Sequence, residues 1–130
     1  MKIRAVNLGG WFVLEYWMKP SLFENLQDSC NDETCFCETQ EHPHELLEEH
    51  HKTWITRDDI VWIKEQGINL VRIPIPWWLF GDGIYHKTID AIDQALAMIE
   101  EVGLDFMLDL HTAPGCQNGF DNGGIQHVLE

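Results

Sequence analysis

Two segments of this chain repeat one order of signals: a helix end, a glycine, an apolar strand and a polar residue. They read EQGINLVRIPI at residues 65–75 and EVGLDFMLDLH at residues 101–111. Nearly continuous apolar runs of this kind are typical of strands that are covered on both faces, as in parallel sheets. A third apolar segment, at residues 3–8, ends at a pair of glycines. The order strand, excursion with helix, strand, helix, strand therefore predicts a βαβ repeat and an α/β fold.

Start and stop signals predict the two helices that separate these strands. Thr56 is suited to cap a helix over residues 57–66, and Gly67 is suited to end it. Thr88 is placed to cap the next helix, whose apolar positions recur at helical spacing until Gly103. Both helices lead directly into a predicted strand.

The excursion after the first strand is less regular. Residues 25–44 are rich in acidic, amide and cysteine side chains and lack apolar periodicity, which predicts an insertion or long loop inside one domain at residues 1–130. A helical pattern begins at Glu45, with Leu46, Leu47 and His50 recurring at helical spacing. The other acidic and histidine side chains of this segment are expected to be solvated.

Residues 104–124, LDFMLDLHTAPGCQNGFDNGG, begin as a predicted buried strand and end in glycine, proline and amide residues. Ligands of α/β proteins bind at the carboxyl ends of the strands. A sugar would need the acceptors, amide donors and aromatic face found here: Asp109, His111, Gln117, Asn118, Phe120, Asp121 and Asn122. The alternative is a polar loop whose side chains serve turn geometry.

Charge excludes two classes of partner. Twenty-two acidic and eight basic residues give a formal charge of −14, which repels nucleic acid and anionic membrane surfaces. No apolar run of about 18 residues is present, so no membrane span is expected. The N-terminal segment is interpreted as mature structure rather than a signal peptide, because Arg4, Asn7 and two glycines interrupt its apolar stretch.

The four cysteines leave the redox compartment open. Cys30, Cys35 and Cys37 fall in one short segment, so a local disulfide is one interpretation, with Cys116 separate.

Three polar residues at successive strand ends form the sharpest constellation. Arg72 interrupts an apolar strand and needs a carboxylate partner. His111 lies at a comparable depth after the third strand, and Glu15 follows the first strand among aromatic residues. Asp109 is left out of the catalytic candidates, because a carboxylate in this position more often orients a neighbour or caps backbone groups.

Three segments carry a resemblance to a known family: VNLGGWFVLEYWMKPSLF, WITRDDIVWIKEQGINLVRIPIPWWLF and LDLHTAPGCQNGFDNGG. Together they resemble the N-terminal part of glycoside hydrolase family 5 of clan A, most closely its fungal exo-β-1,3-glucanase branch. The resemblance covers nearly the whole chain in the right order. It implies a (β/α)8 barrel and a retaining mechanism, with β-1,3-glucan or a β-glucoside as substrate and no cofactor.

The resemblance also implies roles for five residues. The residues matching Glu15 and His111 bind the terminal glucosyl unit, and the arginine matching Arg72 supports the nucleophilic carboxylate. The aromatic matching Phe120 belongs to a clamp at the pocket entrance, with the polar group matching Asn122 close by. Family members are often secreted or associated with the cell wall, and the sequence leaves the localisation of this chain open.

The chain departs from the family because it lacks the motif that carries a catalytic carboxylate and most of the strands of the barrel. Retaining hydrolysis uses two carboxyl groups roughly 5 Å apart, and the resemblance places the acid/base in an Asn-Glu-Pro motif that does not occur here. Both catalytic carboxylates are thus expected to be absent, and the chain to be inactive alone. It supplies about three of the eight strands of the barrel. The exposed sheet edges of this incomplete barrel would then pair with another chain, a second copy included, or stay unpaired.

Two other functions compete with a fragmentary glucosidase. In a non-catalytic β-glucan-binding module, Trp77, Trp78 and Phe120 would stack on sugar rings. Glu15 and His111 would bind the sugar hydroxyl groups. The second alternative is metal binding by a group of cysteines and histidines: Cys30, Cys35, Cys37, His42, His44, His50 and His51. Their spacing fits no standard zinc motif, so no metal site is predicted.

Overall fold

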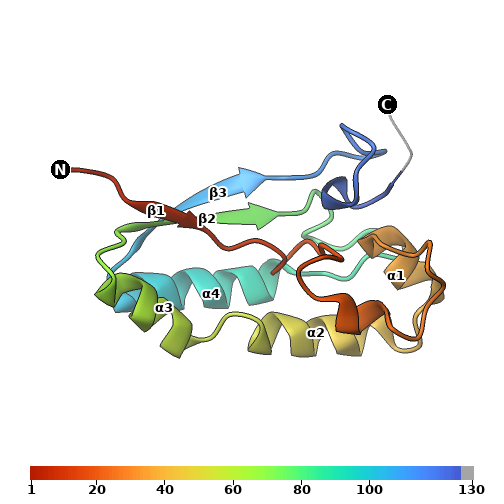
Figure 1. The fold of residues 1–130 in the computed structure, drawn as a ribbon, viewed down its shortest axis with the longest axis horizontal. Coiled ribbons are helices and arrows are strands. Elements are labelled where there is room, and N and C mark those ends of the chain that lie inside the picture. The colour runs from red at the N-terminus through yellow and green to blue at the C-terminus, as the bar shows by residue number, and fades with distance from the viewer. Residues whose placement is uncertain (127–130) are drawn as a thin grey trace.

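The computed structural model describes residues 1–126, and its centre is a three-stranded parallel sheet (Figure 1). The strands are β1 (Ala5–Asn7), β2 (Leu70–Ile75) and β3 (Asp105–Leu110), and β2 lies between the other two. β1 pairs with β2 in parallel, and so does β3. The predicted βαβ order and α/β class are confirmed.

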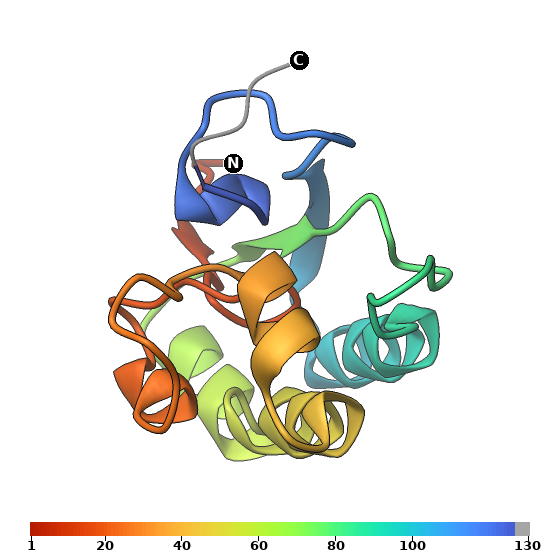
Figure 2. The same cartoon turned by 90° about the vertical axis from the view of Figure 1, so that its right-hand side faces the viewer.

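Within residues 1–126, four α-helices and two short 3-10 helices connect and follow the strands. The α-helices are α1 (Glu33–Thr39), α2 (Pro43–Thr53), α3 (Arg57–Glu65) and α4 (Ile89–Val102), and the 3-10 helices are η1 (Pro20–Phe23) and η2 (Asp121–Gly123). Figures 1 and 2 show α2, α3 and α4 on one side of the sheet. α1 lies elsewhere, beyond the ends toward which the strand arrows point. The described helices include none that is both long and apolar enough to cross a membrane.

The main core lies between the sheet and these helices. Val71 and Ile73 of β2 are fully buried against Ile60 of α3 and Ile99 of α4. Successive side chains of a strand point to opposite faces, so the residues that alternate with Val71 and Ile73 face away from the helices. The second face of the sheet therefore carries Arg72 and its neighbours in register.

The predicted helix signals are confirmed at three of four positions. Thr56 forms a capping box with Asp59: the Thr56 backbone N–H donates to Asp59 Oδ2 at 2.8 Å, and Thr56 Oγ1 accepts from the Asp59 backbone N–H. Gly67 follows the end of α3, and Gly103 ends α4. Thr88 occupies the N-cap position of α4 but makes no side-chain cap bond.

Residues 25–44 are not wholly irregular, contrary to the prediction. Asp32 caps α1 by accepting a hydrogen bond from the Cys35 backbone N–H, at 2.7 Å to Oδ1. Phe36 and Cys37 of α1 are buried in a second, smaller core. The helix was missed because it is only seven residues long, too short for an apolar repeat to be visible.

The cysteine interpretation is confirmed. Cys30 and Cys35 form a disulfide, and Cys37 and Cys116 are free and buried.

The third strand is not buried, and this corrects a second prediction. Met107 is 51% exposed, Leu108 44% and Leu110 66%. Within residues 1–126, β3 pairs only with β2. Phe106 packs partly against the main core, but the rest of the apolar run is largely exposed, and this edge of the sheet ends in open apolar surface.

One histidine of α2 is also placed differently from the prediction. His51 is buried rather than solvated, and His50, which the helical pattern grouped with apolar residues, is buried as well. His50 Nε2 donates to the Gly10 carbonyl oxygen at 2.7 Å, whereas His51 Nε2 has no partner among the described residues. Burial lowers the pKa of His50 to about 4 and the pKa of His51 to about 3.

We expect the free energy of unfolding to fall as the pH drops below 6.5 toward 4, because the unfolded chain then binds protons that the folded histidines refuse. His51→Leu removes one such group without removing a side-chain hydrogen bond. It should therefore reduce the dependence of the unfolding free energy on pH by about 1 kcal/mol per pH unit. Urea unfolding across this pH range measures the slope. His42→Asn, at an exposed position, is the control, and an unchanged slope in His51→Leu would contradict the prediction.

Candidate functional site

Polar side chains from all three strands meet on the sheet face that is turned away from the helices. Asn7 is in register with Arg72, and Pro74 is in register with Asp109. Since Arg72 and Pro74 are two residues apart, they share a face, and Asn7 and Asp109 share it with them. His111 follows Asp109 by two residues and comes directly after β3.

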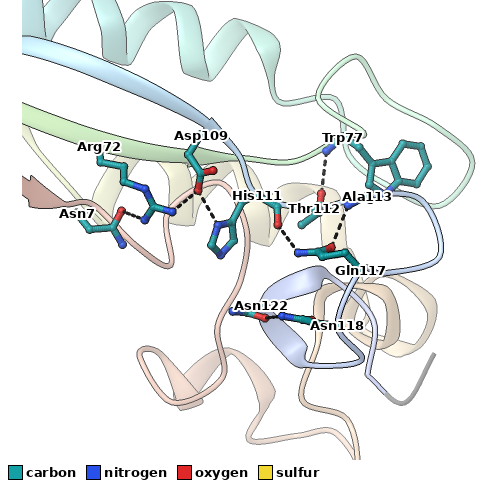
Figure 3. A network of polar contacts seen from close by, with 10 residues as sticks. All are labelled: Asn7, Arg72, Trp77, Asp109, His111, Thr112, Ala113, Gln117, Asn118 and Asn122. Carbon is teal, nitrogen blue, oxygen red and sulfur yellow. Dashed lines mark hydrogen bonds and ion pairs between the residues drawn. The ribbon is translucent and has the colours of Figure 1, made fainter. Parts of the chain in front are cut away.

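These side chains form one continuous hydrogen-bonded row (Figure 3). Arg72 Nη1 donates to Asn7 Oδ1 at 2.9 Å, and Arg72 Nη2 donates to Asp109 Oδ2 at 2.6 Å. His111 Nδ1 lies 2.7 Å from the same Asp109 oxygen. The side chains of Arg72 and Asp109 are 40% and 24% exposed, so the row is anchored in the fold and open to solvent.

The row determines how His111 presents its ring. The oxygen of an ionised carboxylate only accepts hydrogen bonds, so His111 Nδ1 carries the proton and donates to Asp109. Nε2 then has no partner among residues 1–126, and it can accept a hydrogen bond from a hydroxyl group when the ring is neutral. Asp109 therefore acts as an orienting residue, as its place in the sequence predicted.

Glu15 lies near the Asn7 end of the row, without a hydrogen bond to Arg72 or His111. A β-carbon added at Gly9 would come within 3.2 Å of both Asn7 Nδ2 and Glu15 Oε2. The two side chains thus flank Gly9, where the absence of a side chain gives them room. Of the predicted trio, Arg72 and His111 are joined through Asp109, and Glu15 stands beside them.

The loop after β3 carries the other two predicted residues. Gln117 ties the loop to its base, because Nε2 donates to the His111 carbonyl oxygen at 2.8 Å and Oε1 accepts from the Ala113 backbone N–H. Asn122 Oδ1 accepts from Asn118 Nδ2 at 3.3 Å (Figure 3). Phe120 is 64% exposed. Phe120 therefore offers an aromatic surface to solvent, while Asn122 is engaged within its loop.

Asn7 is a member of the row that sequence reasoning missed. Its register with Arg72 is the signal that could have found it, because two polar residues directly opposite each other in adjacent strands lie on one face.

Two features of the competing interpretations do not fit the structure. Trp78 is 1% exposed and stacks on Tyr85 with ring centroids 4.3 Å apart, so its ring is not available to a sugar. Among residues 1–126, no three histidine, cysteine or acidic side chains are grouped so as to hold a metal ion. Cys30 and Cys35 are also consumed by their disulfide.

Comparison with known proteins identifies the relatives of this chain. It is 42% identical over 128 residues to the probable glucan 1,3-beta-glucosidase A of Aspergillus fumigatus and 44% identical over 129 residues to that of Emericella nidulans. The glucan 1,3-beta-glucosidase of Kluyveromyces lactis is 40% identical over 143 residues. These matches cover 94%, 95% and 99% of this chain. The chain is thus similar over nearly its whole length to part of several glucan 1,3-β-glucosidases. The resemblance to glycoside hydrolase family 5 is thereby confirmed.

Solved structures agree with this assignment. The crystal structures of AoRut and of rutinosidase from Aspergillus niger both superpose with a TM-score of 0.84 at 26% identity, over 96% of this chain. No protein-family model matches the chain. The chain spans about a third of the curated relatives described above, 31 to 33% of their length, and 37% of the solved chains.

We expect Asp109→Ala to change the tautomer of His111. Asp109 Oδ2 is the acceptor that holds the proton on Nδ1, so without it the proton of the neutral ring should shift toward Nε2. Nitrogen and Cδ2 chemical shifts of the imidazole measure the tautomer by NMR.

Asp105→Ala is the matched control, because it removes an exposed carboxylate from the other end of the same strand. A His111 ring that keeps its Nδ1 proton in Asp109→Ala would contradict the orienting role.

Proposed function

We propose that this chain forms the sugar-binding wall of a β-glucosidase that acts on β-1,3-glucan or a related β-glucoside. The wall consists of Glu15, Arg72, His111, Phe120 and Asn122. The observation that carries the proposal is the row in which Asp109 joins Arg72 to His111 and leaves His111 Nε2 free.

The chemistry of this surface suits a sugar. Sugar hydroxyl groups both donate and accept hydrogen bonds, and the surface offers a free imidazole nitrogen and the carboxylate of Glu15. Sugar rings also present apolar faces, and the exposed ring of Phe120 gives such a face a flat partner. Asn122 supports the proposal less strongly, because its oxygen is already bonded to Asn118.

Catalysis in this proposal depends on carboxyl groups outside these 130 residues. Retaining hydrolysis uses an acid/base and a nucleophile roughly 5 Å apart. Asp109 is held by Arg72 and His111, and the sequence contains no Asn-Glu-Pro motif. We therefore assign substrate contacts to this chain and no catalytic residue, and we expect the 130 residues alone to be inactive.

The proposed architecture is the first three βα units of a (β/α)8 barrel. Three parallel strands are too few to close a barrel of eight. The exposed side chains of Met107, Leu108 and Leu110 are what a next strand and helix would cover. This open apolar edge favours part of a barrel over a self-contained glucan-binding module.

We expect the chain to bind laminari-oligosaccharides weakly and to release no glucose from them. NMR titration should shift backbone amide signals of residues 109–122, and Phe120→Ala should reduce the affinity about 3- to 10-fold through the lost aromatic contact. Trp62→Ala is the matched control, because Trp62 of α3 is 61% exposed, close to the 64% of Phe120.

Each outcome bears on a separate part of the proposal. Glucose release by the purified chain would overturn the assignment of the catalytic carboxylates to other residues. The absence of any shift at high sugar concentration would overturn the sugar-binding wall.

A further inference from the structure

The first turn of α1 contacts all three loops that follow the strands. These loops comprise residues 8–19 after β1, residues 76–88 after β2 and residues 111–126 after β3. Figures 1 and 2 show α1 (orange) at the end of the sheet from which these loops emerge. Three consecutive residues make the contacts, Asp32, Glu33 and Thr34, and all three side chains are buried, at 6%, 1% and 7% exposure.

Glu33 holds the loop after β1. Its Oε1 accepts a hydrogen bond from the Leu14 backbone N–H at 2.9 Å, one residue before Glu15. Burial raises the pKa of the Glu33 carboxyl to about 8, although the Leu14 N–H and the nearby Trp78 side chain oppose the rise. At neutral pH the carboxyl is therefore protonated, so it serves as a hydrogen-bonding group without burying a charge.

Thr34 joins the loops after β2 and β3 through one hydroxyl group. Its Oγ1 donates to the Gly124 carbonyl oxygen at 2.6 Å and lies 2.7 Å from Tyr85 Oη. A threonine hydroxyl has one proton, so the Tyr85 hydroxyl is the donor in the second bond. The Thr34 backbone N–H also donates to the Gly124 carbonyl oxygen, at 3.0 Å.

Asp32 adds a second bond to the loop after β3. Its Oδ2 accepts from the Gln126 backbone N–H at 2.8 Å, while Oδ1 caps α1. At the same place Gly124 packs directly against Trp78, because a β-carbon added there would lie 2.6 Å from the Trp78 ring. The loops after β2 and β3 are thus in close contact at the place where Thr34 forms hydrogen bonds with both of them.

We propose that Asp32, Glu33 and Thr34 form a clasp that positions the three strand-end loops relative to one another. The clasp touches no predicted sugar contact directly. It acts through Leu14 on the segment that carries Glu15, and through Gly124 and Gln126 on the loop that carries Phe120 and Asn122. Its role in sugar binding rests on the proposed function, whereas its role in holding the loops does not.

Thr34 offers a matched pair of variants. Thr34→Val keeps the shape of the side chain and removes its hydroxyl group. The Tyr85 hydroxyl then loses its partner, and the Gly124 carbonyl oxygen loses one of its two hydrogen bonds. Thr34→Ser keeps the hydroxyl and is the rescue variant. Cys116 reports on the loop after β3, because its thiol is buried inside that loop, and Cys37 reports on α1 and the second core.

The experiment measures alkylation of the two free thiols in the natural chain, with each site quantified by mass spectrometry. We expect Thr34→Val to speed alkylation of Cys116 roughly tenfold, the effect of losing one to two buried hydrogen bonds, and to leave Cys37 nearly unchanged. Thr34→Ser should behave as the natural chain. The clasp is overturned by an unchanged Cys116 rate in Thr34→Val, by equal acceleration at both thiols, or by Thr34→Ser reacting as fast as Thr34→Val.

Asp32→Asn keeps the proposal falsifiable if Thr34→Val does not fold. This variant retains an oxygen for the helix cap and replaces the acceptor of the Gln126 N–H by an NH2 group. Selective acceleration at Cys116 would support the clasp, and an unchanged rate would overturn it.

Oligosaccharide binding separates the two proposals. If the clasp positions the sugar-binding loops, Thr34→Val should bind laminari-oligosaccharides more weakly than the natural chain, and Thr34→Ser should bind them as tightly. Equal affinity in both variants would overturn the link from the clasp to the sugar. If the natural chain binds no sugar, the proposed function fails, and thiol reactivity still decides whether the clasp holds the loops.

Discussion

The register of β2 between its two neighbours is the constraint on which the rest of the structure depends. Because Asn7 lies opposite Arg72 and Asp109 lies opposite Pro74, the guanidinium reaches an oxygen on each side. A shift of one residue in either pairing would turn Asn7 or Asp109 toward the helices. The same register places Val71 and Ile73 in the core, so the packing of one face and the polar row of the other are fixed together.

The sequence predicted those parts of the fold that depend on local chemistry. The capping residue Thr56, the helix-ending Gly103 and the strand around Arg72 were found because each is encoded by neighbouring residues. The ion pair of Arg72 was expected from its apolar surroundings, and the orienting role of Asp109 from its place before His111. Asn7 was missed because its meaning depends on which residue of a distant strand lies opposite it.

Other errors arose where tertiary packing overrides composition. His51 looks like a member of a solvated helix face, yet contact with Phe12 in the segment after β1 buries it. Asp32, Glu33 and Thr34 look like a polar loop, yet all three are buried. Glu33 bonds to the loop after β1, and Asp32 and Thr34 bond to the loop after β3. An apolar run predicts that β3 is to be covered, but it does not say which residues will do so.

The uncovered edge of β3 makes the net charge of the chain important for keeping separate copies apart in solution. An open strand edge with apolar side chains is a template for pairing with other edges. A formal charge of −14 on 130 residues makes two copies repel each other before such edges meet. Salt shortens the range of this repulsion to about 10 Å at 0.1 M. The contribution of the acidic residues to the solubility of the isolated chain should therefore decrease as the ionic strength rises.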